Sequence, residues 1–199
     1  MIEVEKKVHL DPIQLKKIQL KATFLHSKQI EDTYYDTDDF RYTLENIWIR
    51  KRNRSFEVKA AVVKESGLID RYDEIVQEEL IIRKLGLKNT SSLPSLLEEN
   101  GILPFCTFTT LRQKYQYKEF AIDLDRANFG ALQYDVAEIE LVVTSEEEIP
   151  IAENKINSLL QEFGLNSDKQ VLAKLSYFLS KERPDHFNAL KNAKVIRSY

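Results

Sequence analysis

The sequence lacks the features that place many proteins outside the cytosol or in a membrane. Among its 199 residues there is one cysteine, Cys106, which excludes an internal disulfide and fits a reducing compartment. No apolar run approaches the ~20 residues that span a bilayer, and the acidic start of the chain is unlike a secretory signal. We therefore expect a cytoplasmic monomer that has no membrane partner.

Histidine and net basic charge are also scarce. The histidines His9, His26 and His186 are far apart and show no metal-ligand spacing, and no histidine motif accompanies Cys106. A packed thiol is therefore favoured over a nucleophile. The formal net charge of −3 argues against a general nucleic-acid-binding surface. The length and the 43% hydrophobic content fit one domain, residues 1–199, with a sizeable core.

Charged residues at alternate positions are the main feature that is present. In a strand, Glu3, Glu5 and Lys7 would share one face, with neighbours roughly 6–7 Å apart. A solvated edge strand is the simple interpretation of one such motif. The pattern recurs, however, in five further segments: Arg50/Arg52, Glu57/Lys59, Arg112/Lys114, Asp123/Asp125 and Glu138/Glu140. This recurrence indicates that charged strand faces meet in one place.

The remaining patterns predict an α+β fold with about eight strands. Strands are predicted at about 2–9, 30–37, 44–53, 55–64, 68–77, twice within 103–125, and at 131–144; helices are predicted at about 11–27, 78–87, 92–100, 150–164, 167–182 and 184–192. Short connections favour antiparallel pairing. Because unpaired charge is costly in a dry core, we predict a closed antiparallel barrel with charges in its lumen and apolar faces under the helices. A sandwich with its charges outside is the alternative.

A lumen that carries both signs of charge suits a polyanion chelated to a divalent cation. Arginine forks and lysine ammonium groups bind phosphate oxygens. Paired carboxylates hold Mg²⁺ or Mn²⁺, which would bridge to the phosphate. Phosphoryl transfer requires little beyond positioning, a metal and electrostatic stabilisation. The charged pairs could supply all three without a conventional nucleophile.

The ordered charged pairs resemble those of the CYTH superfamily, the triphosphate tunnel metalloenzymes, over nearly the whole chain. A more specific likeness, to the thiamine triphosphatases within that superfamily, is carried by Ile2–Glu5, Thr33–Thr37, Trp48–Arg52, Asp123–Asp125, Phe129-Gly130, Ala173–Leu179 and Arg183-Pro184. The resemblance implies an eight-stranded tunnel barrel that requires divalent metal. It also implies that water attacks the terminal phosphorus of a triphosphate and releases inorganic phosphate.

The resemblance also implies roles for individual positions. The triphosphate would be bound by Lys7, Arg50, Arg52, Lys59, Arg112 and Lys174, and the metal would be held, directly or through water, by Glu3, Glu5, Asp123, Glu138 and Glu140. Tyr34 with Lys59 would assist the attacking water. Trp48 would recognise thiamine by stacking or by a cation–π contact worth about 0.5–2 kcal/mol, unless it only fills the barrel mouth. Lys174 could instead be a surface lysine of a late helix.

Two positions depart from the family pattern. Leu111 stands where the animal enzymes tend to carry another basic residue, so a phosphate contact could be missing there. Glu74, near an acidic position of the family pattern, is a weaker acidic candidate.

The expected activity is hydrolysis of thiamine triphosphate to thiamine diphosphate and phosphate. A general tripolyphosphatase, or another triphosphate phosphohydrolase, is the nearest alternative because it would share the phosphate-binding residues. Nothing in the sequence favours an adenylyl cyclase of the same superfamily. A non-catalytic polyphosphate-binding module would not need the complete acidic set.

Overall fold

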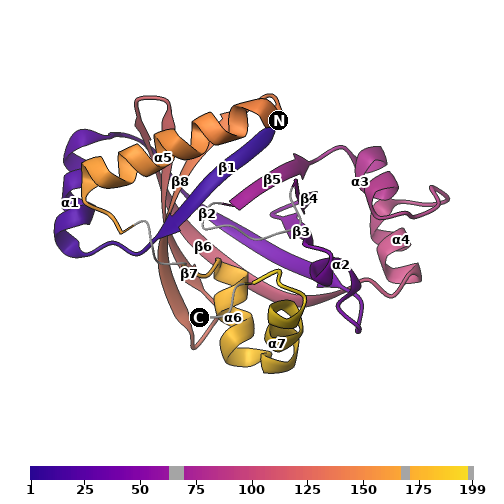
Figure 1. Ribbon diagram of the computed structural model, residues 1–199. Helices are drawn as coiled ribbons and strands as arrows, with labels where there is room; N and C mark the ends of the chain where they lie inside the picture. Colours follow the sequence, from indigo (N-terminus) through magenta and orange to yellow (C-terminus); the bar gives the residue numbers. More distant parts are fainter. Residues whose placement is uncertain (63–69, 167–170, 197–199) are drawn as a thin grey trace.

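The computed structural model describes residues 1–62, 70–166 and 171–196 (Figure 1). The strands are β1 (Ile2–Val8), β2 (Thr23–Asp36), β3 (Ile47–Arg52), β4 (Ser55–Ala61), β5 (Asp70–Ile75), β6 (Leu103–Tyr117), β7 (Phe120–Asn128) and β8 (Gln133–Val143). The α-helices are α1 (Pro12–Lys21), α2 (Arg41–Leu44), α3 (Glu78–Lys84), α4 (Leu93–Glu99), α5 (Ile149–Phe163), α6 (Lys174–Glu182) and α7 (Pro184–Asn192). None of these helices has the length and apolarity that a membrane span requires.

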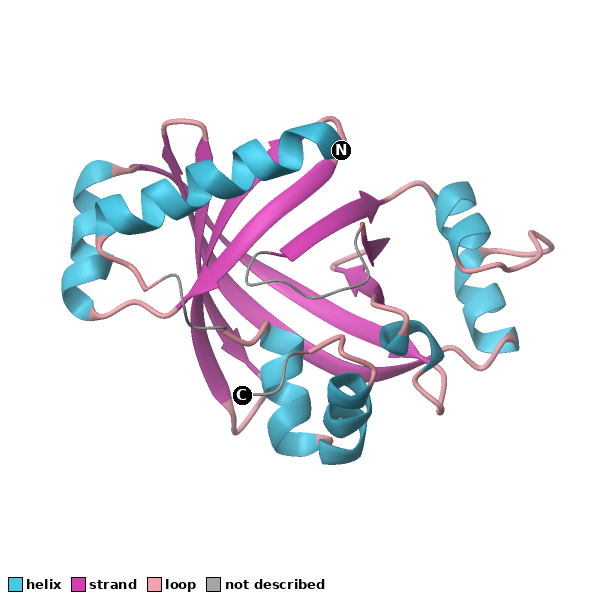
Figure 2. Cartoon of the chain, in the orientation of Figure 1, coloured by secondary structure: helices cyan, strands magenta, loops and turns pink. Residues whose placement is uncertain are grey.

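The eight strands close into a ring in the order β1-β5-β4-β3-β2-β6-β7-β8, and β8 pairs with β1. Every neighbouring pair is antiparallel. The prediction of a closed antiparallel barrel is therefore confirmed. Figure 2 shows that the helices lie outside the strands, with α5 crossing over β1 and β8.

The apolar faces of the strands point outward and pack under the helices. Val4 of β1 and Ile139 of β8 are fully buried in one cluster with Ile156 of α5. Ile49 of β3 and Val58 of β4 are buried in a second cluster with residues of α3 and α4. Since strand side chains alternate between faces, the charged residues between these positions must point into the lumen.

The first helix is shorter than predicted. Its N-cap residue is Asp11, whose side chain accepts hydrogen bonds from two backbone N–H groups at 2.8 Å. Aspartate is favoured at this position because it can accept such bonds. The helix ends at Lys21, so the helix predicted over 22–27 was wrong. Those residues begin β2, where Thr23 lies opposite Gln116 of β6. Long-range pairing with β6 decides the conformation here, and a local apolar pattern cannot report it.

Two other boundaries also differ from the prediction. The strand predicted from residue 44 begins only at Ile47, because the chain first forms the short helix α2. Of the helix predicted over 167–182, residues 171–173 are not helical and α6 starts at Lys174. Residues 167–170, and the strand ends predicted at 63–64 and 68–69, lie outside the described residues.

A buried polar contact holds the C-terminal helices against the barrel. The hydroxyl of Thr43 in α2 donates to Asp36 at 2.6 Å and therefore accepts from Nε2 of His186 in α7 at 2.7 Å. The imidazole is 1% exposed, stacks on Phe40 at 3.9 Å, and meets the edge of Phe105. This contact supports the α6–α7 pair, which brings Lys174 to the lumen.

Candidate active site

The lumen of the barrel contains a cavity of about 370 Å³ with a densely charged wall. All but one of the expected site residues line it: Glu3, Glu5, Lys7, Tyr34, Trp48, Arg50, Arg52, Lys59, Arg112, Glu138, Glu140 and Lys174. Glu74 lines it as well. The exception is Asp123, which is fully buried in contact with Arg112. A second cavity of about 360 Å³ has a mainly apolar wall on the outer side of β6–β8, and it holds none of the expected residues.

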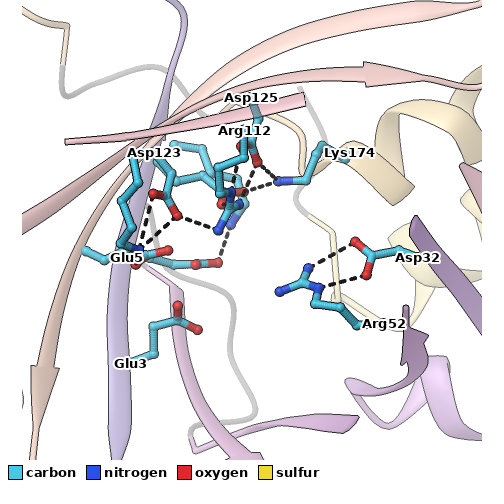
Figure 3. Close-up of polar contacts among 12 residues, drawn as sticks. Glu3, Glu5, Asp32, Arg52, Arg112, Asp123, Asp125 and Lys174 are labelled. Carbon is cyan, nitrogen blue, oxygen red and sulfur yellow. Dashed lines mark hydrogen bonds and ion pairs between the residues drawn. The ribbon is translucent and has the colours of Figure 1, made fainter. Parts of the chain in front are cut away.

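Arg112 of β6 lies at the centre of one cluster of ion pairs (Figure 3). Its guanidinium donates to Asp125 in a forked geometry at 2.7 and 2.6 Å, to Glu138 at 2.7 Å, and also contacts Asp123. Lys174, at the start of α6, reaches the same two carboxylates, Asp125 at 2.5 Å and Glu138 at 2.7 Å. Burial opposes ionisation of Glu138, but Lys174 and Arg112 hold its pKa well below the usual range. Glu138 is therefore an ion that two cations already satisfy.

Lys59 of β4 forms the second cluster, with acidic residues of β1 and β5. Its ammonium contacts Glu3 and lies 3.7 Å from Glu5 and 3.9 Å from Glu74. Lys7 pairs with Glu5 at 2.6 Å. Burial opposes the charge on Glu5, yet Lys59 and Lys7 lower its pKa to about 2. Burial likewise opposes the charge on Lys59, but Glu5 and Glu3 raise its pKa, so Lys59 is an ammonium at neutral pH.

The two arginines of β3 are each held by a carboxylate. Arg50 donates to Glu57 and to Glu74, both at 2.8 Å. Arg52 forms a forked pair with Asp32 at 2.8 and 2.9 Å. Burial opposes the charge on Asp32, but the hydrogen bond from Arg52 and the charges of Arg52 and Arg50 together lower its pKa. Both forks are thereby fixed on the lumen wall, as recognition of planar or tetrahedral anions requires.

Glu140 of β8 differs from these paired groups because carboxylates dominate its surroundings. It belongs to two acidic groups whose oxygens lie within 4.8 Å of one another, Glu3–Glu5–Glu140 and Asp123–Glu138–Glu140. Its nearest ion-pair partner, Lys114, is 3.7 Å away. Burial, followed by the charges of Glu3 and Asp123, raises its pKa well above the usual range.

This acidic excess fits a hard divalent cation. Mg²⁺ and Mn²⁺ prefer carboxylate oxygens, and a cation would remove the repulsion around Glu140. Within the described part of the chain, a buried oxygen of Asp123, Oδ1, also has no hydrogen-bond partner, although Lys114 lies 3.2 Å from it. All five of the expected metal ligands belong to these two groups.

The structure also places Tyr34 and Trp48, to which roles were assigned, and Leu111, which departs from the family pattern. Tyr34 lines the cavity and stacks on Phe108, and among the described residues no hydrogen bond joins its hydroxyl to Lys59. The suggested Tyr34–Lys59 pair therefore stays a prediction. Trp48 lines the cavity and donates its indole N–H to Asn46 at 2.7 Å. Leu111 is half exposed and lines the outer cavity. A basic residue at this position would therefore not point into the lumen, and the lumen loses no phosphate contact through Leu111.

The cavity also includes residues to which no role was assigned. Lys28, Tyr72 and Lys114 line its wall. Lys114 follows Arg112 by two positions, so the strand alternation could have assigned it. Lys28 could not be found in this way, because its strand begins where a helix was predicted.

The structure is a closed antiparallel barrel lined by paired cations and carboxylates, with one acidic excess, and its charges suit a polyanion and a divalent cation. Comparison with known proteins agrees: the CYTH domain model matches residues 1–173, so the chain belongs to the CYTH family. The thiamine-triphosphatases of Macaca fascicularis and Homo sapiens are each 29% identical to it, over 96% of this chain and 89% of theirs.

Solved structures show the same fold at lower sequence identity. PH1819 of Pyrococcus horikoshii matches with a TM-score of 0.61 at 23% identity, covering 90% of this chain and 99% of that one. A putative adenylyl cyclase from Hippeastrum, described as having a dominant triphosphatase activity, matches with a TM-score of 0.56 at 16% identity. The match covers 90% of this chain and 95% of that one. At these identities the likeness concerns the fold alone.

Proposed function

We propose that this protein hydrolyses thiamine triphosphate to thiamine diphosphate and inorganic phosphate with Mg²⁺, for which Mn²⁺ could substitute. The observation that carries the proposal is the lumen, where fixed cations and an excess of carboxylates around Glu140 surround one cavity. The two thiamine-triphosphatase relatives support the choice of substrate.

The ion pairs of the lumen explain how it would receive a triphosphate. Lys7, Lys59, Arg112 and Lys174 are each held by carboxylates, and these contacts keep their charged ends in the cavity wall. Phosphate oxygens would replace some of the carboxylates as partners of these cations. The side chains would need little reorganisation, which is how preorganised charge lowers a barrier.

The released carboxylates need a new positive partner. Glu3, Glu5 and Glu140 form one group that would hold a divalent cation, and Asp123 and Glu138 would complete a second group with Glu140. When bound, such an ion would neutralise charge that develops on the phosphate oxygens. The carboxylates and the cations thus have complementary tasks in one cavity.

In the reaction, the oxygen of water forms a bond to the terminal phosphorus. The bond from that phosphorus to the bridging oxygen breaks, and one proton is released. Because Lys59 is already an ammonium, it would bind phosphate oxygen or orient the water, and it would not take the proton. Tyr34 lines the same cavity, and its hydroxyl would orient the water.

A substrate panel tests the proposal. Phosphate release from thiamine triphosphate, inorganic tripolyphosphate and ATP would be measured with Mg²⁺, with Mn²⁺ and with EDTA. We expect a much higher kcat/KM for thiamine triphosphate and no turnover in EDTA. Equal or faster turnover of tripolyphosphate would replace the proposal with a general tripolyphosphatase, and turnover in EDTA would refute the metal requirement.

Two arginines provide a matched test of the lumen. Arg112 and Arg126 both form forked pairs with an aspartate, Asp125 in the lumen and Asp135 on the exposed outer surface. Arg112→Met should reduce kcat/KM by at least about 100-fold, the scale of losing one charged transition-state contact, whereas Arg126→Met should leave it unchanged. Similar losses in the two variants would mean that the lumen is not the site.

A further inference from the structure

Asn46 has an unusual backbone in the turn between α2 and β3. Its φ is +58°, in the left-handed region that asparagine tolerates better than most residues. Its N–H donates to the carbonyl of Thr43 at 3.0 Å, and its carbonyl accepts the N–H of Ala61 at 3.1 Å. The residue is 6% exposed. The backbone thus fixes the position of the Asn46 side chain behind the lumen wall.

The side-chain oxygen of Asn46 contacts two aromatic residues of that wall. Oδ1 accepts the indole N–H of Trp48 at 2.7 Å, and the Tyr72 hydroxyl lies 3.5 Å from the same oxygen. The indole N–H can only donate, so the oxygen of the amide must face Trp48. Trp48 and Tyr72 both line the lumen cavity, whereas Asn46 does not.

These aromatics lie directly beside a cation of the phosphate site. Trp48 is opposite Lys59 in the β3–β4 pairing, and the Lys59 ammonium is 5.8 Å from the centre of the Tyr72 ring. An organic group joined to a phosphate chain at Lys59 would therefore meet Trp48 and Tyr72. Such rings favour aromatic or cationic heterocycles, through stacking and cation–π contacts.

We propose that Asn46 is a positioning residue for substrate specificity. By hydrogen bonding to Trp48 and Tyr72, it fixes the two rings that would bind an aromatic, positively charged heterocycle at the end of the triphosphate. This inference rests on the proposed function and adds to it the residue that positions the two aromatic rings. Asn46 itself would not touch the substrate.

Two substitutions separate the side-chain contact from the backbone. Asn46→Gly keeps the left-handed backbone and removes the acceptor, whereas Asn46→Asp keeps an acceptor oxygen in the same place. For Asn46→Gly we expect an increase in KM for thiamine triphosphate of about 3- to 10-fold, the size expected for one lost hydrogen bond. Turnover of tripolyphosphate, which has no ring, should change less than about twofold, and Asn46→Asp should restore the wild-type ratio.

Trp48 provides an independent readout because it is the single tryptophan of the chain. Without substrate, Asn46→Gly should increase acrylamide quenching of its fluorescence and lower its anisotropy, and Asn46→Asp should not. The inference is overturned by unchanged fluorescence in Asn46→Gly, by equal losses for the two substrates, or by failure of Asn46→Asp to restore either readout. If the wild type does not prefer thiamine triphosphate, the proposed substrate fails, and the fluorescence data alone decide whether Asn46 holds Trp48.

Discussion

Two glutamates separated by one residue on β8 should respond in opposite ways to replacement by glutamine. Glu140 lies among carboxylates, whereas Glu138 is bound by Lys174 and Arg112. We expect Glu140→Gln to stabilise the metal-free protein and Glu138→Gln to destabilise it. Both variants should lose turnover.

The magnitudes follow from the distances. At an effective dielectric constant of about 20, one like charge within 4.8 Å costs at least about 3.5 kcal/mol. The ammonium of Lys114, at 3.7 Å from Glu140, offsets part of this repulsion. We therefore expect Glu140→Gln to raise the free energy of unfolding by about 1–3 kcal/mol. Glu138→Gln removes a charge that satisfies two buried cations and should cost about 3 kcal/mol.

The pH dependence has a definite sign. The pKa of Glu140 is raised in the folded protein, so folding favours the protonated form of this side chain. The ionised form therefore destabilises the fold, and this effect grows as pH rises above the ordinary value of 4.5. The advantage of Glu140→Gln should accordingly be present at pH 7.5 and absent at pH 4. The pKa of Glu138 is lowered, so the loss in Glu138→Gln should also be greatest at neutral pH and should shrink in acid.

Thermal and urea unfolding in EDTA at pH 7.5 would measure these changes, with about 2–4 °C in Tm for each kcal/mol. A titration with Mg²⁺ should then raise the Tm of the wild type more than that of Glu140→Gln. The reasoning would be refuted if both variants shifted Tm in the same direction in EDTA. Unchanged phosphate release in the two variants would refute the metal assignment.

Three further predictions test other parts of the structure. Trp48→Ala should reduce kcat/KM for thiamine triphosphate by about 2- to 30-fold, the range of one cation–π contact, and spare tripolyphosphate; proportional losses would make Trp48 structural. Tyr34→Phe keeps the stacked ring and should lower kcat about 10-fold without raising KM, and an unchanged kcat would exclude a role of the hydroxyl. His186, whose charged neighbours are Asp36 and Arg183, has a pKa lowered by burial to about 4 from 6.5, so the wild type should lose about 3 kcal/mol of stability as pH falls through that window. Urea unfolding at pH 7 and pH 4.5 should show this loss in the wild type and not in His186→Phe.

The lumen could be predicted because strand alternation is a local property. Once Glu3 and Glu5 occupy one face of a strand, the opposite face must carry Val4, and the structure has this arrangement. The same rule applies to Glu138 and Glu140 around Ile139. The barrel followed because charge on so many strand faces cannot be buried without partners.

Other features depend on contacts between distant segments. Whether residues 22–27 are helical is decided by their pairing with β6, which a local apolar pattern does not contain. Lys174 was assigned from the family resemblance alone, since a lysine on a helix normally lies on the solvated face. In the structure Lys174 is buried against Asp125 and Glu138, which lie far from it in the sequence. The contact of Asn46 could not be predicted from the sequence. It depends on a left-handed backbone conformation that brings the side-chain oxygen within hydrogen-bonding distance of Trp48.

The ion pairs within the lumen explain why a metal and an anion would bind together. An anion that entered alone would compete with carboxylates for Lys59 and Arg112, and would leave those carboxylates buried and unpaired. A cation that entered alone would relieve the repulsion around Glu140 but would leave lysines and arginines without partners. A triphosphate with its divalent ion supplies both charges at once, so the exchange of partners leaves no buried ion uncompensated. For this reason affinity for either component should rise when the other is present, which is the reciprocity expected of two coupled ligands.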